Sequence, residues 1–275
     1  RVTGDRLRIG DAQVDLSRAS RLLVVGAGKA AASMAAAAEQ ILGERISGGT
    51  VNTKYGHALS LRRLRCTECG HPVPDQAGVD GTMAMLAATA GLDPSAVVLC
   101  LLSGGGSALL PAPAAGLTLA DKQATTQMLL ACGATIGQIN TLRKHLSAVK
   151  GGQLARHLRP ARVFTLALSD VIGDPLETIA SGPTFPDPTT FADCARLVDR
   201  FGLAARLPAA VRQRLEAGVA GQVADTPKPG EDCFARTVNH VIGNNALAIA
   251  AAEKEARALG YAPLVLTSRL QGEAR

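Results

Sequence analysis

The feature that most constrains the fold is an apolar segment followed by a glycine-rich or polar turn, which occurs four times in the chain. The four copies occupy 22–29, 96–107, 163–170 and 238–245. Alanine-rich sequence with helical character follows the first and the last copy, at 30–42 and 246–259. Continuous apolar strands that alternate with helices are typical of a parallel sheet covered on both faces. The sequence therefore predicts an α/β fold with a Rossmann-like, doubly wound, mostly parallel sheet and helices on both faces.

The other segments are predicted to surround this sheet. The middle of the chain, 118–159, is predicted to be helical, and Thr118 with Asp121 suits a capped helix start. The first twenty residues contain two Gly-Asp turns and indicate a peripheral hairpin. A short apolar run at 263–267 has the pattern of a strand.

Composition excludes several classes of protein. The chain carries 29 Lys and Arg against 23 Asp and Glu, a net charge of +6 that suits acidic small molecules. Aromatic residues make up only 3% and Trp is absent, so few side chains can stack on bases, and we expect no nucleic-acid partner. No apolar run approaches about 18 residues, and a polar stretch opens the chain. We therefore expect a cytoplasmic protein with no membrane partner.

The first turn, Gly26 to Ala31, matches the G-x-G-x-x-A pattern that binds dinucleotides. That pattern also requires an acidic residue about 20 positions further on to hold the ribose. The next strand-like run, 50–54, ends without one. Gly28 and Lys29 are better suited to a phosphate or carboxylate, because a helix N-terminus favours anions. A tight turn with an exposed lysine is the alternative.

The second turn, which we call the glycine loop, holds three consecutive glycines between two serines. Its residues are Ser103, Gly104, Gly105, Gly106 and Ser107. Without Cβ atoms, successive backbone amides can wrap closely around an anion. No Walker P-loop sequence occurs in the chain, and a bare flexible loop is the alternative. The position at the carboxyl end of a strand favours phosphate binding.

A polar stripe accompanies the helix predicted around 136–149. Asn140, Arg143, Ser147 and Lys150 each follow an apolar position by one residue, which places them about 100° around the helix axis. Two cations, an amide and a hydroxyl in line could clamp an anionic substrate. An ordinary solvated helix face gives the same pattern.

Two carboxylates follow the third strand. Asp170 lies where catalytic bases and Mg²⁺ ligands are found in such sheets. Asp174 is a second candidate metal ligand, although its position before Pro175 equally suits a helix N-cap. The turn at 181–184 and the segment 71–75 could bring further polar groups to the same edge.

Five segments of the chain are similar, in order, to the class II glycerate kinases, whose bacterial members are often labelled hydroxypyruvate reductase. The segments are G-A-G-K-A at 26–30, H-P-V-P-D at 71–75, S-G-G-G-S-A at 103–108, N-T-L-R-K-H-L-S-A-V-K-G-G at 140–152 and L-S-D-V-I-G-D-P-L-E-T-I-A-S-G-P-T at 168–184. The resemblance covers nearly the whole chain, and the last segment is quite specific. It implies that 1–275 forms the Rossmann-like N-terminal domain and that the family's smaller C-terminal domain, which closes a cleft, lies beyond position 275.

The resemblance also implies an activity, which is transfer of the γ-phosphoryl group of ATP to D-glycerate, usually at the 2-hydroxyl, with Mg²⁺. Lys29 would stabilise the phosphate, and Asp170 would be the catalytic or metal-site carboxylate. The glycine loop would hold the nucleotide phosphates, while Arg143 and Lys150 would contact an anion. A homodimer is compatible with this description. A nicotinamide-dependent hydroxypyruvate reductase and a catalytically incomplete ligand-binding fragment are the alternatives.

Overall fold

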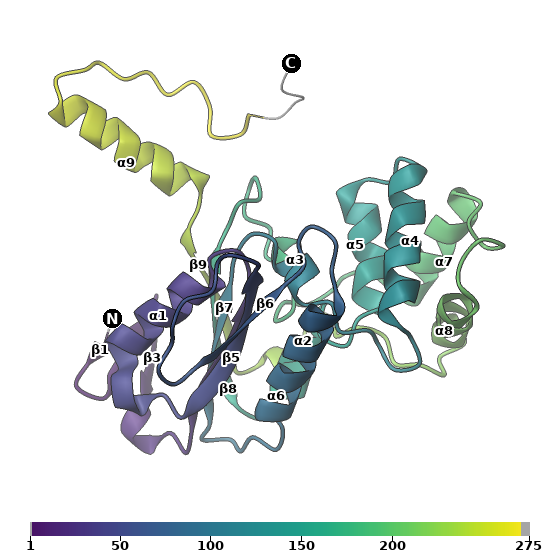
Figure 1. The fold of residues 1–275 in the computed structure, drawn as a ribbon, viewed down its shortest axis with the longest axis horizontal. Helices are drawn as coiled ribbons and strands as arrows, with labels where there is room; N and C mark the ends of the chain where they lie inside the picture. The colour runs from purple at the N-terminus through teal and green to yellow at the C-terminus, as the bar shows by residue number, and fades with distance from the viewer. Residues whose placement is uncertain (1, 271–275) are drawn as a thin grey trace.

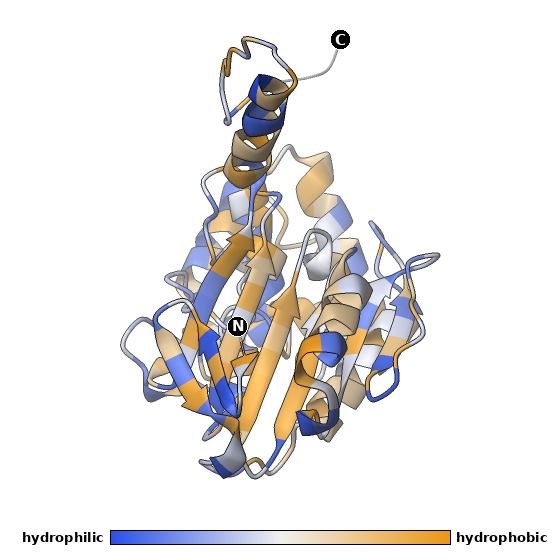
Figure 2. Ribbon diagram, turned by 90° about the vertical axis from the view of Figure 1, so that its left-hand side faces the viewer, coloured by the Kyte–Doolittle hydropathy of each residue, from blue (hydrophilic) through white to orange (hydrophobic). Residues whose placement is uncertain are grey.

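The computed structural model describes residues 2–270, and its centre is a six-stranded, fully parallel sheet in the order β6-β5-β4-β7-β8-β9 (Figure 1). The strands are β4 (Leu22–Ala27), β5 (Gly48–Lys54), β6 (Arg65–Cys69), β7 (Val97–Leu102), β8 (Arg162–Leu168) and β9 (Thr237–Gly243). The two central strands, β4 and β7, are buried along their whole length, as their continuous apolar sequence predicts. The apolar colouring of the strands in Figure 2 shows the same pattern. The predicted α/β parallel sheet is confirmed.

Each face of the sheet has its own apolar core. Alternate residues of β4 point to opposite faces, so that Val24 lies in one core and Val25 in the other. One face packs against α1 (Ala31–Leu42) and against a small antiparallel sheet of β1 (Val2–Thr3), β2 (Arg6–Ile9) and β3 (Ala12–Asp15). The other face packs against α2 (Gln76–Ala88), α3 (Gly106–Leu109) and α6 (Gln153–Leu158). The hairpin predicted for the first twenty residues is thus three-stranded.

A helical lobe with a third core lies beside the sheet (Figure 1). It consists of α4 (Leu119–Ala131), α5 (Ile136–His145), α7 (Phe191–Arg200) and α8 (Ala209–Val219). The predicted cap is present, because the side chains of Thr118 and Asp121 each accept a hydrogen bond from the other's backbone amide. Helix α5 ends at His145, earlier than the periodic pattern through 149 predicts. Single turns of 3-10 helix occupy 16–18, 43–45, 179–181 and 232–234.

Helix α9 (Asn245–Ala258) projects away from the body of the molecule (Figure 1) and buries none of its residues. The strand predicted at 263–267 is wrong, since this segment pairs with no described strand and leaves Leu264 and Leu266 more than four-fifths exposed. A strand needs a neighbour to satisfy its backbone, which an apolar sequence run alone does not supply. Among the described helices, none combines the length and apolar character needed to cross a membrane.

Candidate active site

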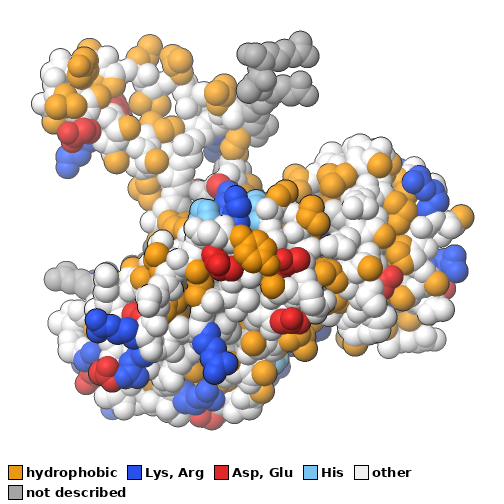
Figure 3. Space-filling view, viewed as in Figure 1, with side chains coloured by type: hydrophobic (Ala, Val, Ile, Leu, Met, Phe, Trp, Pro, Cys, Tyr) orange, Lys and Arg blue, Asp and Glu red, His pale blue; other side chains and the backbone are white. Residues whose placement is uncertain are grey.

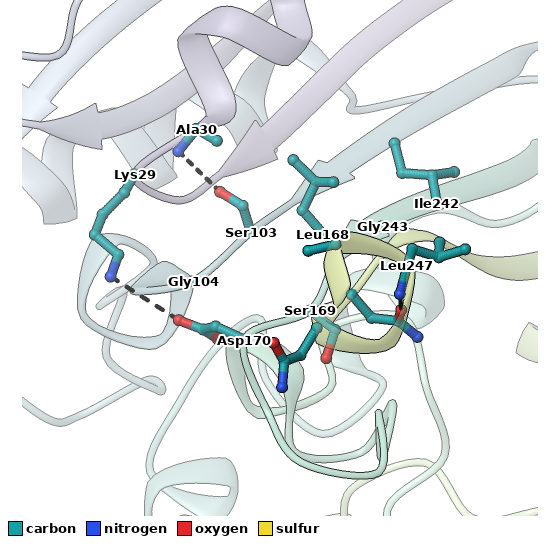
Figure 4. Close-up of a pocket in the computed structure, with 13 residues that line it drawn as sticks. Lys29, Ala30, Ser103, Gly104, Leu168, Ser169, Asp170, Ile242, Gly243 and Leu247 are labelled. Carbon is teal, nitrogen blue, oxygen red and sulfur yellow. Dashed lines mark hydrogen bonds and ion pairs between the residues drawn. The ribbon is translucent and has the colours of Figure 1, made fainter. Parts of the chain in front are cut away.

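The four polar turns meet at the carboxyl edge of the sheet, around a cavity of about 800 Å³ (Figure 4). After β4 the chain forms β5 on one side of β4, and β7 later pairs with the opposite side. The turns after β4 and β7 therefore flank a topological switch point, where doubly wound sheets bind ligands. Figure 3 shows the hollow beneath the projecting α9. The polar lining residues are Lys29, Ser103, Ser169, Asp170, Asn244 and Asn245.

Lys29 and Asp170 face one another across this cavity (Figure 4). Lys29 comes from the turn after β4 and Asp170 from the turn after β8, and Lys29 Nζ lies 3.9 Å from Asp170 Oδ2. Their side chains are 45% and 59% exposed, so both are open to a ligand. Exposed ion pairs contribute little to stability. Each member can therefore exchange its partner for a ligand at small cost.

The backbone amides around Lys29 are already used within the protein. The amide of Gly28 donates to Asn52 O at 3.1 Å, and that of Lys29 donates to Gly104 O at 2.9 Å. The amide of Ala30 donates to Ser103 Oγ at 3.0 Å, and Ser103 is only 3% exposed. This turn therefore offers a ligand the Lys29 side chain, whereas Gly28 and Ser103 hold the turn against the glycine loop.

The glycine loop passes close to several side chains of the site. A Cβ atom on Gly104 would lie 2.0 Å from Asp170 Oδ2, and one on Gly105 would lie 2.8 Å from His71 Nε2. Gly106 begins α3 and packs against Ala180. The amides of Gly104 and Gly105 have no hydrogen-bond acceptor among the described residues. The loop therefore has two amide donors that no described residue uses, one at Gly104, which lines the cavity of Asp170, and one at Gly105, as an anion-binding loop requires.

Two glycine substitutions should differ in their effect on the free energy of unfolding, because one disturbs packing and the other moves a side chain of the site. Gly28→Ala places Cβ 2.0 Å from Ser103 Oγ and 2.7 Å from Ser103 O, at a φ of 146°. We expect a loss of about 2–4 kcal/mol in the free energy of unfolding, from backbone strain and overpacking. The three atoms nearest to a Cβ on Gly104 all belong to the carboxylate group of Asp170, so Gly104→Ala should cost less than about 1 kcal/mol while displacing that exposed carboxylate. Denaturant unfolding of both variants tests this, and equal losses would contradict it.

The polar stripe at 140–150 is not a solvated helix face, because most of it is buried. Asn140 Oδ1 accepts a hydrogen bond from Ser181 Oγ at 3.2 Å, and Ser147 is fully buried. Lys150 lies beyond the end of α5, in the turn at 146–152, and is also buried. Arg143 and Lys150 do not line the cavity of Lys29 and Asp170. They line a second cavity on the other side of the glycine loop.

The segment 180–181, whose backbone is strained, contacts the glycine loop. Ala180 and Ser181 have φ angles of 51° and 62°, which non-glycine residues rarely adopt. Ser181 Oγ lies 2.8 Å from Ser107 Oγ, which links this segment to the loop. Such strain persists only where the surroundings determine it, typically near functional sites. The sequence locates a turn here, but nothing in it signals the left-handed backbone.

Asp174 is not a helix N-cap, since no helix begins at Pro175 and the next helical turn starts only at Ile179. It has a φ of 53°, and its Oδ2 accepts a hydrogen bond from Asn244 Nδ2 at 2.6 Å. Asp170 and Asp174 line one small cavity of about 200 Å³. Within residues 2–270, no three His, Cys, Asp or Glu side chains form a metal-binding group. Two carboxylates nevertheless suit Mg²⁺, because this ion usually binds one or two carboxylates together with substrate phosphates.

Comparison with known proteins places this geometry in a family. Residues 2–216 match the family model described as a domain of unknown function, DUF4147. Two Agrobacterium vitis proteins that carry the provisional name hydroxypyruvate reductase are 46% and 45% identical over 255 residues, 93% of this chain. Glycerate 2-kinase of Pyrococcus horikoshii is 38% identical over 275 residues, 100% of this chain.

Two solved structures are similar to this chain over most of its length. A crystal structure of a Pyrococcus horikoshii protein matches 95% of this chain with a TM-score of 0.87 at 38% identity. A Thermotoga maritima glycerate kinase matches 88% of it with a TM-score of 0.79 at 39% identity. This chain spans only part of these proteins, namely 56%, 64% and 61% of the three sequences and 58% and 55% of the two structures. The chain belongs to the DUF4147 family and is a homologue of the glycerate kinases.

Proposed function

We propose that this chain supplies the phosphate-binding and catalytic edge of an enzyme that transfers the γ-phosphoryl group of ATP to the 2-hydroxyl of D-glycerate. The observation that carries the proposal is the Lys29–Asp170 pair, 3.9 Å apart at the switch point of the sheet and beside the free amides of the glycine loop. A cation, a carboxylate and backbone donors around one open cavity are the groups that phosphoryl transfer needs. Kinship with the glycerate kinases supports the choice of acceptor.

In this proposal the protein acts by positioning and by charge. The hydroxyl oxygen of the acceptor forms a bond to the γ-phosphorus, and the bond from that phosphorus to the β,γ-bridging oxygen breaks, which releases ADP. The carboxylate of Asp170 accepts the hydroxyl proton or holds the metal. The ammonium group of Lys29 and the amides of Gly104 and Gly105 stabilise the oxygens of the transferred group.

The same edge suits Mg²⁺. Asp170 and Asp174, which line one small cavity, would hold the ion through carboxylate oxygens. Bound there, Mg²⁺ would supply positive charge that neutralises the phosphate oxygens. Asn244 donates a hydrogen bond to Asp174 and so keeps that carboxylate oriented.

A nicotinamide-dependent reductase is the second candidate, favoured by the name of the Agrobacterium relatives. Against it stands the carboxyl end of β5, which carries Asn52, Thr53 and Lys54 where a dinucleotide site needs an acid. Asn52 donates to Gly78 O and Leu109 O, and Thr53 donates to Gly28 O. Both side chains therefore serve the packing of this edge.

Phosphorus NMR of the full-length protein with D-glycerate, ATP and Mg²⁺ tests the proposal. We expect loss of the γ-phosphate signal and the appearance of ADP and a phosphate ester, whose coupling identifies the phosphorylated hydroxyl. A parallel reaction with hydroxypyruvate and NADH should show no loss of nicotinamide absorbance. Turnover only in the second reaction would refute the kinase. Ligand binding without either turnover would favour the incomplete fragment.

A further inference from the structure

A second cavity, of about 370 Å³, lies on the other side of the glycine loop from Lys29 and Asp170. The side chain of Lys122, on α4, lines this cavity and is only 8% exposed. Arg143, on α5, lines the same cavity and shares with Lys122 a small void between residues of the two helices. A group attached to Lys122 that enters the cavity therefore comes close to Arg143.

Lys122 has no acidic neighbour in this cavity, since among the described residues no aspartate or glutamate lines it. The titratable side chains that face Lys122 there are all bases, namely Arg143, Lys150 in the turn after α5, and His71 in the segment before α2. A buried lysine without a carboxylate partner gives up its proton more easily, because its charge has lost hydration. Burial, together with the charge of Arg143, lowers the pKa of Lys122 to about 7. A large share of Lys122 is therefore a neutral amine at neutral pH.

The hydrogen bonds of Lys122 fit this neutral form. Lys122 Nζ donates to Pro111 O at 2.6 Å and to Ala112 O at 3.2 Å. A neutral amine has two hydrogens and one lone pair, so these two bonds use both hydrogens. Carbonyl oxygens only accept, and no described group donates to Nζ. The lone pair of the amine is therefore free to react.

Two other buried lysines show what sets Lys122 apart. Lys144 on α5 lies 3.2 Å from the fully buried carboxylate of Asp187, which neutralises its ammonium group within the protein. Lys150 lines the second cavity and also donates to two backbone carbonyls, but it is only 2% exposed. Lys122 is therefore the more accessible of the two lysines that line this cavity.

Arg143 is the group in this cavity that keeps a full charge. A guanidinium group stays protonated near neutral pH, whereas burial lowers the pKa values of both Lys150 and His71. Arg143 makes no hydrogen bond or ion pair with another described residue. A carboxylate formed inside the cavity would therefore gain a charged partner whose donors are unused.

We propose that Lys122 is a carboxylation site, at which carbon dioxide adds to Nζ and forms a carbamate inside the second cavity. The lone pair of the amine forms a bond to the carbon atom, one C=O π pair moves onto its oxygen, and the nitrogen releases a proton to solvent. The carbamate keeps one N–H group, which still donates to Pro111 O, while its oxygens accept from Arg143. No oxidant, reductant or metal is required. The modification does not depend on the transfer reaction proposed above.

Carbamate occupancy should increase with pH. The carbamate forms from the neutral amine and releases a proton, so a rise of pH through the pKa of Lys122, at about 7, favours it twice. At constant carbon dioxide pressure we expect occupancy to rise by about 10-fold or more from pH 6 to pH 8. An ordinary lysine, with a pKa of about 10.4, is almost entirely protonated over this range and should stay unmodified.

Chemical trapping of the full chain under carbon-13-labelled carbon dioxide at pH 8 tests the proposal. Triethyloxonium converts a carbamate into a stable ethyl ester, and peptide mass spectrometry then identifies the modified lysine. We expect the label at Lys122, and neither at Lys144, which pairs with Asp187, nor at the exposed Lys254. Carbon-13 NMR should show a carbamate signal that Lys122→Gln removes and that the matched control Lys254→Gln preserves.

Variants of Arg143 test the surroundings of the carbamate. Arg143→Gln should lower occupancy by about 10-fold and Arg143→Lys by less, because the carbamate loses or keeps a cationic partner. Thermal denaturation confirms that each variant is folded. No trapped carbamate at Lys122 in the unaltered chain overturns the proposal, and so does trapping at Lys150 in its place. Equal occupancy at pH 6 and pH 8, or full occupancy in Arg143→Gln, overturns it as well.

Discussion

Replacing Lys29 with alanine is expected to lower kcat for phosphoryl transfer to D-glycerate by about 10²–10³-fold, the usual effect of removing one donor from developing charge. The ammonium group of Lys29 lies 3.9 Å from Asp170 in the cavity that Gly104 also lines. Among the described residues no other lysine or arginine lines that cavity, so none can replace its charge. Steady-state kinetics on the full-length protein, with both substrates saturating, measure the change.

Two further lysine variants make this result specific. Lys254→Ala removes an exposed lysine of α9 that lines neither cavity, and it should leave kcat unchanged. Lys29→Arg keeps the charge but alters its geometry, and it should retain more activity than Lys29→Ala. Near-normal turnover of Lys29→Ala would remove Lys29 from the proposed mechanism.

The sequence predicts the sheet and its ligand-binding edge because the signals involved are local. A continuous apolar run such as Val97–Leu102 indicates a buried parallel strand, and the turn after it must lie at the carboxyl edge. Lys29 and Asp170, 141 positions apart, are brought together by this rule alone. Parallel topology therefore converts local patterns into a prediction about a distant pair.

The apolar periodicity around 136–149 predicts a longer helix than α5. The apolar spacing continues from Ile139 to Val149, yet α5 ends at His145. The chain then turns through Gly151 and Gly152, which have φ angles of 57° and 81°. Apolar spacing reports which residues are buried, and residues in a buried turn can keep the spacing of a helix by chance. Lys150 is consequently buried against the segment 107–110 and does not lie on a helix face.

The second cavity could not be predicted from sequence because packing between separate elements creates it. Lys122 looks like an ordinary lysine of a capped helix, and it is buried only because α4 packs against the segment 111–112. Similarly, the residues directly after Asp174, at 175–178, form no helix, and Asp174 lies instead in a loop where it accepts a hydrogen bond from Asn244. Local sequence indicates what a residue can do, whereas packing decides whether it does so.

Replacing Asp170 with asparagine is expected to lower kcat by about 10²–10⁴-fold, since the variant keeps the size of the side chain but loses its charge and its ability to accept a proton. The exposed carboxylate pairs with Lys29 and lies against Gly104. Asp199→Asn, an exposed site on α7 that lines neither cavity, is the matched control and should retain full activity.

Titration with Mg²⁺ assigns the role of that carboxylate. If Asp170 accepts the proton of the hydroxyl group, the Mg²⁺ concentration for half-maximal activity should be the same in Asp170→Asn as in the unaltered protein, and excess metal should restore nothing. If Asp170 holds the ion, that concentration should rise and excess Mg²⁺ should recover part of the activity, with Asp174→Asn producing a smaller change of the same kind because both carboxylates line one cavity. Turnover of Asp170→Asn within a few-fold of normal at every Mg²⁺ concentration would show that the chemistry takes place elsewhere.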